Sequence, residues 1–317
     1  MTTRRIPWAF FALFLLLSVP FWVMGALSPR FLPAWIPINL PTAALMTFNP
    51  ALAALVLTGR EEGWAGVSAL LRRLLDGWRR PGAAAWWVAF LYMPVVMALN
   101  YGWVVAQGRQ PQPAIVEITL LPVLFAMFLV GAVGEELGWQ GYAYDRLEAR
   151  WGVAPAALGL GVFWALIHVW PLFQAERAPL WILWHCLGQV FMRVIIVWLY
   201  RLSGRSLPAV IVFHAMINVA EYLIPNYGSS YDPVVVTSLM GLTVVAIAFS
   251  WEPMFRDAKR LLYRGGRPNA LARLLNRFWA SVYALGIAPN RYVTLEVVGR
   301  KSGRVITFPL VMVIVDG

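Results

Sequence analysis

Long apolar stretches with few charged residues constrain the fold more than any other feature of this sequence. A helix needs roughly 20 apolar residues to cross the hydrocarbon core of a bilayer. With 60% hydrophobic and only 13% charged residues, the chain of 317 residues has too little polar surface for a water-soluble globule. We expect an all-α, polytopic membrane protein of about eight transmembrane helices, at residues 6–27, 40–59, 83–105, 115–133, 153–171, 180–200, 207–224 and 233–251.

Arginines in the connecting segments indicate the orientation. Under the positive-inside rule, the loops rich in arginine lie on the cytoplasmic side. The formal net charge of +11 fits an anionic membrane surface, and we expect lipid contact but no nucleic-acid partner. Both termini are predicted to be cytoplasmic in a multi-pass protein of the cell membrane, because the arginine-rich segments include Arg4, Arg5, Arg60, Arg72, Arg73, Arg79, Arg80, Arg146, Arg150, Arg201 and Arg205.

Two segments leave alternatives open. The first apolar run is longer than the core of a signal peptide and no A-x-A site follows it, which favours a retained anchor. Between the second and third spans, Trp64, Leu71 and Trp78 share one helical face, and Arg72 and Arg79 fall elsewhere. This pattern predicts either a helix lying on anionic lipid or a simple solvated connector.

Ionisable side chains inside predicted spans are costly and usually face a polar cavity. All three histidines, His168, His185 and His214, fall within spans, and Glu135 and Glu136 end the fourth apolar run. A hairpin turning at Trp151 and Gly152, midway between Glu135 and His168, brings these two side chains to one depth. For this the segment 144–150 must extend the fourth helix beyond the membrane.

Helical spacing sorts these residues by direction. His214, Asn218 and Glu221 follow the i, i+4, i+7 pattern of one helix face. Adjacent residues point about 100° apart around a helix. Glu135 and Glu136 should therefore do different jobs, one facing a reacting water and the other holding its neighbours through hydrogen bonds.

Three short motifs on separate helices resemble the CAAX protease and bacteriocin-processing (CPBP) family of intramembrane proteases. The family pattern is E-E-x-x-x-R, F-x-x-x-H and H-x-x-x-N, and this sequence reads EELGWQG from 135 to 141, FWALIH from 163 to 168 and HAMIN from 214 to 218. Gln140 stands where the family has arginine. Trp164, rather than Phe163, stands four residues before His168.

The resemblance implies an intramembrane endopeptidase acting on a membrane-associated peptide or protein. Glu135, helped by His168, would activate water, and His214 and Asn218 would stabilise the oxyanion. The supporting residues would be Glu136, Gln140 and Trp164. Some families of this kind are called metalloproteases, and Glu135, His168 and His214 could hold a zinc ion. No cofactor is predicted, because Asn218 has a role as an oxyanion donor and none as a zinc ligand.

The last part of the chain differs in character. We expect a transmembrane protease domain over 1–251, a basic linker over 252–273 and a partial domain over 274–317. A helix is predicted at 270–285, followed by a β-hairpin with strands 292–298 and 305–315. The stretch GRKSGRVITFPL from 299 to 310 resembles the start of a deazaflavin-dependent nitroreductase, a split β-barrel, and 274–317 would be only a fragment of it.

A non-catalytic reading uses the same helices. The protein could be a membrane immunity or scaffold factor, or a small-solute transporter with a polar cavity. Transport would predict related halves and a proton relay that continues to the outer face, and the sequence shows neither. His185 and Arg193 lie outside the motifs, and His185 is expected to be a structural hydrogen-bonding residue.

Overall fold

The chain divides by its internal contacts into two units, Met1–Met254 and Phe255–Gly317. In the first unit the computed structural model describes residues 7–28, 42–109, 118–223 and 231–251. In the second it describes 263–264, 267–270, 272–274, 276–277, 280, 292–298, 303 and 305–311. Parts of the predicted spans at 6, 40–41, 115–117 and 224 lie outside these residues, as does most of the predicted linker.

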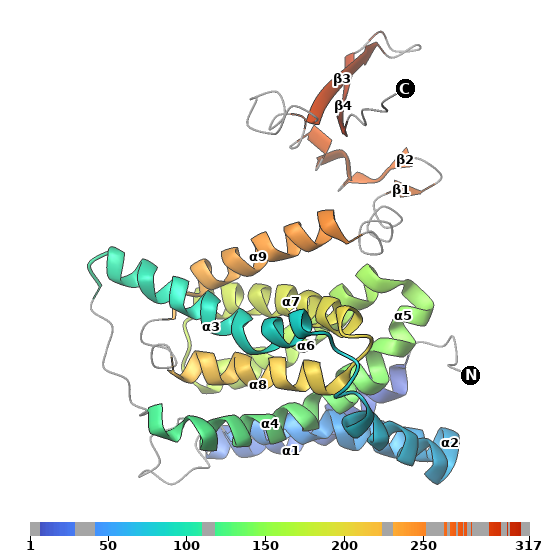
Figure 1. Ribbon diagram of the computed structural model, residues 1–317, viewed down its shortest axis with the longest axis vertical. Helices are drawn as coiled ribbons and strands as arrows, with labels where there is room; N and C mark the ends of the chain where they lie inside the picture. The colour runs from blue at the N-terminus through green and yellow to red at the C-terminus, as the bar shows by residue number, and fades with distance from the viewer. Residues whose placement is uncertain are drawn as a thin grey trace. The chain divides into compact units, whose positions relative to one another are not determined.

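The described part of the first unit is helical and follows the predicted spans closely (Figure 1). Each long helix coincides with an apolar run, because only a helix satisfies its backbone groups without water. The helices are α1 (Trp8–Leu27), α2 (Asn49–Asp76), α3 (Ala83–Ala106), α4 (Leu121–Gly138), α5 (Asp145–Trp151), α6 (Val153–Gln174), α7 (Pro179–Leu202), α8 (Leu207–Leu223) and α9 (Pro233–Ser250), with the 3₁₀ segments η1 (Thr42–Phe48) and η2 (Ile118–Leu120) and the π-helical segment η3 (Trp139–Tyr144).

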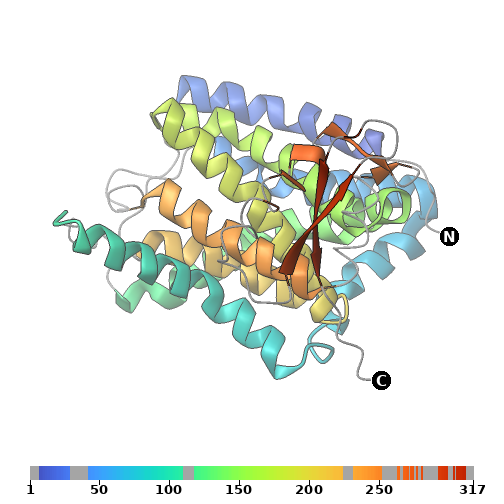
Figure 2. The same ribbon diagram turned by 90° about the horizontal axis from the view of Figure 1, so that it is seen from above.

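α8 is the central helix of this unit. It packs against α2, α3, α4 and α7, and the neighbouring helices lie on several sides of it (Figures 1 and 2). Between Leu207 and Tyr222 no residue of α8 is exposed. His214, in the middle of α8, therefore lies within the bundle.

The outer surface of the bundle is that of a multi-pass membrane protein. In the described residues, six helical segments are long and apolar enough to cross a membrane, and the apolar parts of α8 and α9 are shorter. Large apolar side chains lie on the outside of several helices, as expected in contact with lipid. Examples more than 60% exposed are Trp8, Leu16, Leu27, Trp87, Val123, Leu166, Leu180, Leu183 and Leu242.

The predicted hairpin between the fourth and fifth spans is present. α4, η3 and α5 form one helical run from Leu121 to Trp151, and Gly152 then turns the chain at a φ of 86°. This left-handed conformation suits glycine, which has no Cβ to clash. Glu135 and Glu136 thus lie inside a long helix, although hydropathy alone ends the span near residue 133.

The segment between the second and third spans is helical, as one of the two readings of its sequence expects, and its contact with lipid stays a prediction. α2 continues to Asp76 and is interrupted only at Gly63, where φ is 65°. Trp64 and Leu75 are exposed, but Arg73 turns to the protein and binds Asp145 at 3.1 Å. This stretch is therefore held to the bundle by an ion pair.

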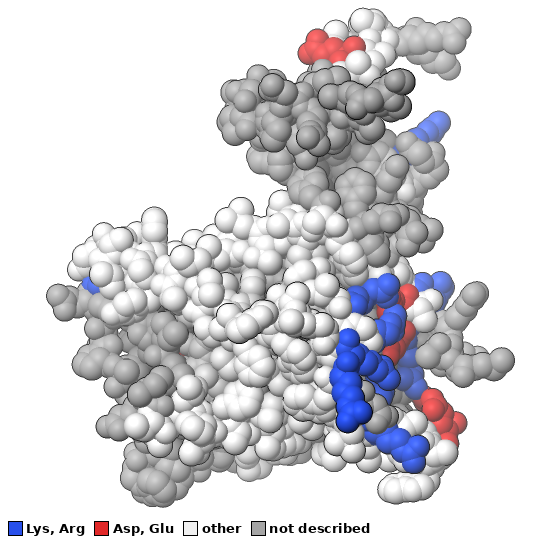
Figure 3. Space-filling model, in the orientation of Figure 1, with Lys and Arg blue, Asp and Glu red and all other residues white. Residues whose placement is uncertain are grey.

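Charged side chains gather at one end of the helical unit, where α2 and α5 lie (Figure 3). Asp145 accepts from Arg73 and from Arg205 at 2.9 Å, and Glu148 accepts from Arg201 and from Arg205 at 2.6 Å. We call these five residues the end cluster. It ties α5 to α2 and to the turn after α7.

The second unit contains the predicted hairpin. β3 (Tyr292–Val298) pairs antiparallel with β4 (Val305–Val311), with Tyr292 opposite Val311 and Val298 opposite Val305. A short ladder joins β1 (Tyr263–Arg264) to β2 (Arg267–Pro268). Described residues between 270 and 280 are helical, as predicted, whereas 281–285 and the predicted end of the second strand at 312–315 lie outside the described residues.

Candidate active site

Glu135 lies on α4 with its carboxylate surrounded by donors from three segments. Trp164 Nε1–H donates to Oε2 at 2.9 Å, and Trp139 Nε1–H donates to the same oxygen at 3.3 Å. The hydroxyl of Thr47 lies 3.1 Å from Oε1 and 3.2 Å from the Gly131 carbonyl, between which it shares its proton. The Glu135 side chain keeps 15% of its surface exposed, so it is oriented but reachable.

Glycines on α4 allow Thr47 to come this close. A Cβ at Gly134 would lie 2.8 Å from the Thr47 carbonyl oxygen, and one at Gly138 would lie 2.3 Å from the backbone of Pro50. Helix backbones can approach closely only where small residues meet. The sequence thus brings η1 and the start of α2 against the face of α4 that carries Gly134 and Gly138, one on each side of the acidic pair.

Glu136 has the opposite environment, with no exposed surface. Arg193 Nη1 of α7 donates to both carboxylate oxygens, at 3.0 and 2.8 Å. His214 Nδ1 of α8 lies 2.7 Å from Oε1. The adjacent glutamates therefore point to different places, one partly exposed and one fully enclosed by two other helices, as their spacing predicts.

His168 lies one turn after Trp164 on α6. Its Nδ1 is 2.6 Å from the Trp164 carbonyl oxygen, and Glu135 lies within electrostatic range of the ring. Because a carbonyl oxygen only accepts, Nδ1 carries the hydrogen, and in the neutral ring Nε2 remains an acceptor. This tautomer can take a hydrogen bond from a water molecule at the site.

The indole ring of Trp164 joins the two motif histidines. Its centroid lies 5.1 Å from that of His168 and 5.7 Å from that of His214, and both pairs meet edge to face. His214 Nε2 lies 3.9 Å from Glu135 Oε1. Glu135, His168 and His214 thus surround one small region beside Trp164, although they come from three helices.

The remaining predicted residues are less closely joined. Asn218 lies on α8 one turn beyond His214, partly buried, and makes no hydrogen bond to any residue that the structure describes. Glu221 is buried one turn further. Gln140 is fully buried, and neither atom of its amide has a partner among the described residues. The structure brings Asn218 to the same helix face but does not attach Gln140 to the carboxylates.

Three residues that hold the site were not assigned to it from sequence: Thr47, Trp139 and Arg193. Arg193 gave a signal, because it is a cation in the middle of an apolar span. Thr47 and Trp139 gave none, since their spacing from Glu135 identifies neither as a partner. His185 lies in an aromatic contact instead, stacked on Trp181, with Nδ1 3.2 Å from the Tyr231 hydroxyl.

The predicted alternative zinc ligands do not form a metal site in this arrangement. Within the residues described, no group of three His, Cys, Asp or Glu side chains is placed to hold a metal ion. Nδ1 of each motif histidine is also directed to another protein group.

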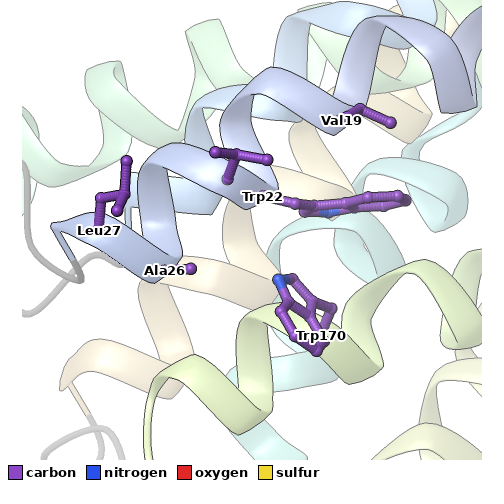
Figure 4. Close-up of a pocket in the computed structure, with 6 residues that line it drawn as sticks. Val19, Trp22, Ala26, Leu27 and Trp170 are labelled. Carbon is purple, nitrogen blue, oxygen red and sulfur yellow. The ribbon is translucent and has the colours of Figure 1, made fainter.

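An apolar pocket of about 360 Å³ lies between α1 and α6 (Figure 4). Trp22 and Trp170 line it from these two helices, with Val19, Val23, Ala26 and Leu27. Trp170 follows His168 by two residues, but the lining includes none of the predicted catalytic side chains. The pocket suits hydrocarbon and is distinct from the region around Glu135.

Comparison with known proteins bears on the same helices. Residues 117–220 match the family described as type II CAAX prenyl endopeptidase Rce1-like. This range holds the acidic pair, both motif histidines and Asn218. The chain is also 30% identical over 183 residues to CAAX prenyl protease 2 of Methanococcus maripaludis, an alignment covering 53% of this chain and 66% of the relative. The helical unit is thus similar to CAAX proteases, and the family match does not extend to 274–317.

Proposed function

We propose that this protein is an intramembrane endopeptidase that hydrolyses a peptide bond of a membrane-associated peptide or protein. The observation that carries the proposal is the geometry of Glu135. Its carboxylate is held by Trp139, Trp164 and Thr47 beside two histidines, within a bundle whose outer face is apolar. The similarity to CAAX proteases supports the same class of reaction.

In the proposed mechanism Glu135 accepts a proton from water as the water attacks the peptide carbonyl. A general base contributes about 10²- to 10⁴-fold when it is held within hydrogen-bond reach of the water. His168, with Nε2 as its acceptor, orients the same water. The Trp and Thr donors fix the direction of the carboxylate before substrate arrives.

The developing oxyanion would be stabilised by His214 and Asn218. Since Nδ1–H of His214 donates to Glu136, His214 can donate to an oxyanion only when Nε2 is also protonated. Asn218 can supply an amide hydrogen, because its side chain has no other partner in the described part of the chain. Preorganised donors of this kind act strongly where water is scarce.

The decisive variant is Glu135→Gln, which keeps the shape of the side chain and removes the base. Comparing the proteomes of membranes that contain wild-type or Glu135→Gln protein identifies the accumulating substrate. Cleavage of the corresponding peptide by purified protein should then fall about 10²- to 10⁴-fold. Glu61→Gln, an exposed carboxylate on α2, is the control and should cleave normally. An unchanged biological effect in Glu135→Gln would instead support a scaffold or transport role.

Two details of the reaction can be tested with the same peptide. The matched relative is called a prenyl protease, so we propose that the peptide be assayed with and without a prenyl group. Treatment with a metal chelator should leave the cleavage rate unchanged if Glu135 acts without zinc. A rate that is lost on chelation and restored by zinc would show that the mechanism depends on metal.

A further inference from the structure

The buried Arg193 of α7 contacts two residues that hold the candidate site, Glu136 and Trp164. Its Nη1 lies 3.0 and 2.8 Å from the two oxygens of Glu136. Its guanidinium carbon lies 4.4 Å from the centre of the Trp164 ring, whose Nε1–H binds Glu135. Arg193 thus contacts Glu136, which binds His214, and Trp164, which binds the proposed base Glu135.

Close packing of α6 against α7 places Arg193 near both residues. A Cβ at Gly161 of α6 would lie 3.2 Å from the Arg193 Cβ and 3.1 Å from the Val190 carbonyl oxygen. Glycine at this position lets α6 and α7 approach closely, and Arg193 itself has no exposed surface. A residue so fully enclosed cannot serve as a headgroup anchor for the helix.

Charge balance gives Arg193 a further role. Glu135 and Glu136 bring two negative charges into the bundle, and Arg193 brings one positive charge. A second proton on His214 makes the total zero. Without Arg193 the same protonation state leaves uncompensated negative charge in a medium that solvates charge poorly.

Gln140 supplies no charge to Glu136 from the same helical run. Gln140 follows Glu136 by four residues, a spacing at which a glutamate and a following cation can pair on one helix. In this chain position 140 offers a neutral amide, and neither of its polar atoms has a partner in the described residues. The carboxylate of Glu136 is bound instead from α7.

We infer that Arg193 is a positioning residue of the proposed peptidase: it holds Glu136 so that His214 keeps its orientation, and it supplies from α7 the cation that position 140 does not. This inference rests on the proposed function. Arg193 has no exposed surface through which it could contact a substrate. Its removal should therefore lower kcat and leave KM nearly unchanged.

The test uses purified full-length protein and the peptide identified through Glu135→Gln. Arg193→Gln should lower kcat by about 10²-fold, the loss expected when a catalytic group is misplaced by about 1 Å. Arg201→Gln, on the same helix and paired with Glu148 outside the site, is the matched control and should retain kcat. A wild-type kcat in Arg193→Gln, or equal losses in both variants, would overturn the inference.

Two rescue variants separate the charge from the fold. Arg193→Lys should recover most of kcat, because a single nitrogen of Arg193 makes both contacts to Glu136. Arg193→Gln combined with Gln140→Arg should recover at least part of it. If Arg193→Lys is as slow as Arg193→Gln, the role assigned to the charge is wrong. If Arg193→Lys recovers kcat but the double variant does not, a cation at position 140 cannot replace the one at position 193, and that part of the inference is wrong.

The inference remains testable if Arg193→Gln does not fold. Replacing both partners, with Arg193→Met and Glu136→Gln, leaves no buried charge unpaired, and such pairs are often well tolerated. This protein should fold but turn over slowly, because His214 loses its anionic partner. A wild-type kcat here would contradict the inference. Normal cleavage by Glu135→Gln would instead contradict the proposed function, so the two failures are distinguishable.

Discussion

The helical unit contains two groups of ion pairs that use the same residue types in different surroundings. In the end cluster three arginines meet two acids, and Arg205 and Arg73 keep 44% and 30% of their side chains exposed. Around Glu136 one arginine and one histidine meet a carboxylate with no exposure at all. Water and salt screen the first group, whereas the second depends on its own partners. Burial, more than the number of ion pairs, therefore decides how much stability a substitution costs.

The strongest test of this comparison removes the buried acid. Glu136→Ala leaves Arg193 without its carboxylate, and breaking a buried pair in this way typically costs about 3–5 kcal/mol. We expect a fall of that size in the free energy of unfolding, measured by denaturant titration in detergent micelles. The combined replacement of Glu136 and Arg193 should be milder. If Glu136→Ala lowers the free energy of unfolding by less than about 1 kcal/mol, the buried ion pairs contribute no more than exposed ones, and the contrast with the end cluster is wrong.

A second test concerns the close helix contact that supports the site. Gly138→Ala would set a methyl group 2.3 Å from the Pro50 backbone, so α4 and α2 must separate. We expect about 1–3 kcal/mol of destabilisation, the usual range for overpacking. The control is Gly102→Ala in α3, where a Cβ meets nothing within 4 Å and alanine favours the helix. Equal stability of the two variants would argue against the tight contact.

The smallest effect is expected at the exposed end. Burial lowers the pKa of Arg205, but Glu148 and Asp145 raise it by more, so the net direction is upward. A group with a raised pKa loses its contribution only as the pH rises through that value, so Arg205 stays charged at neutral pH. Arg205→Gln should cost no more than about 1 kcal/mol, less at high salt. A larger, salt-independent loss would contradict the contrast drawn between the two groups.

Much of the bundle could be predicted, because a segment in lipid must satisfy its own backbone hydrogen bonds and therefore forms a helix. Each of the eight predicted spans coincides with a helix in the structure, although those of α8 and α9 are shorter than the others, and the turn at Gly152 follows from the break in hydropathy. The convergence of Glu135, His168 and His214 could also be predicted, since an apolar bundle has few places for ionisable groups. The different directions of Glu135 and Glu136 follow from helix geometry, which turns adjacent residues about 100° apart.

Partners between helices could not be predicted in the same way. Spacing along the chain predicts which residues share one face of a helix, but it does not predict which other helix packs against that face. Thr47 reaches Glu135 only because glycines let α4 and η1 touch, and Arg193 reaches Glu136 past Gly161. The ion pair between Arg73 of α2 and Asp145 of α5 likewise joins residues far apart in the chain. These outcomes depend on distances between helices that the order of residues does not contain.

The π-helical segment η3 separates the acidic pair on α4 from the acids of α5. In a helix of constant pitch, the ten-residue interval from Glu135 to Asp145 would fix the angle between their side chains. A π-helical turn holds more residues than an α-helical turn, so each residue of η3 rotates less about the axis and the angle between the two ends differs from that of an α-helix of equal length. The end-cluster acids Asp145 and Glu148 are therefore not held in the same α-helical register as Glu135 and Glu136, although all four belong to one continuous helical run.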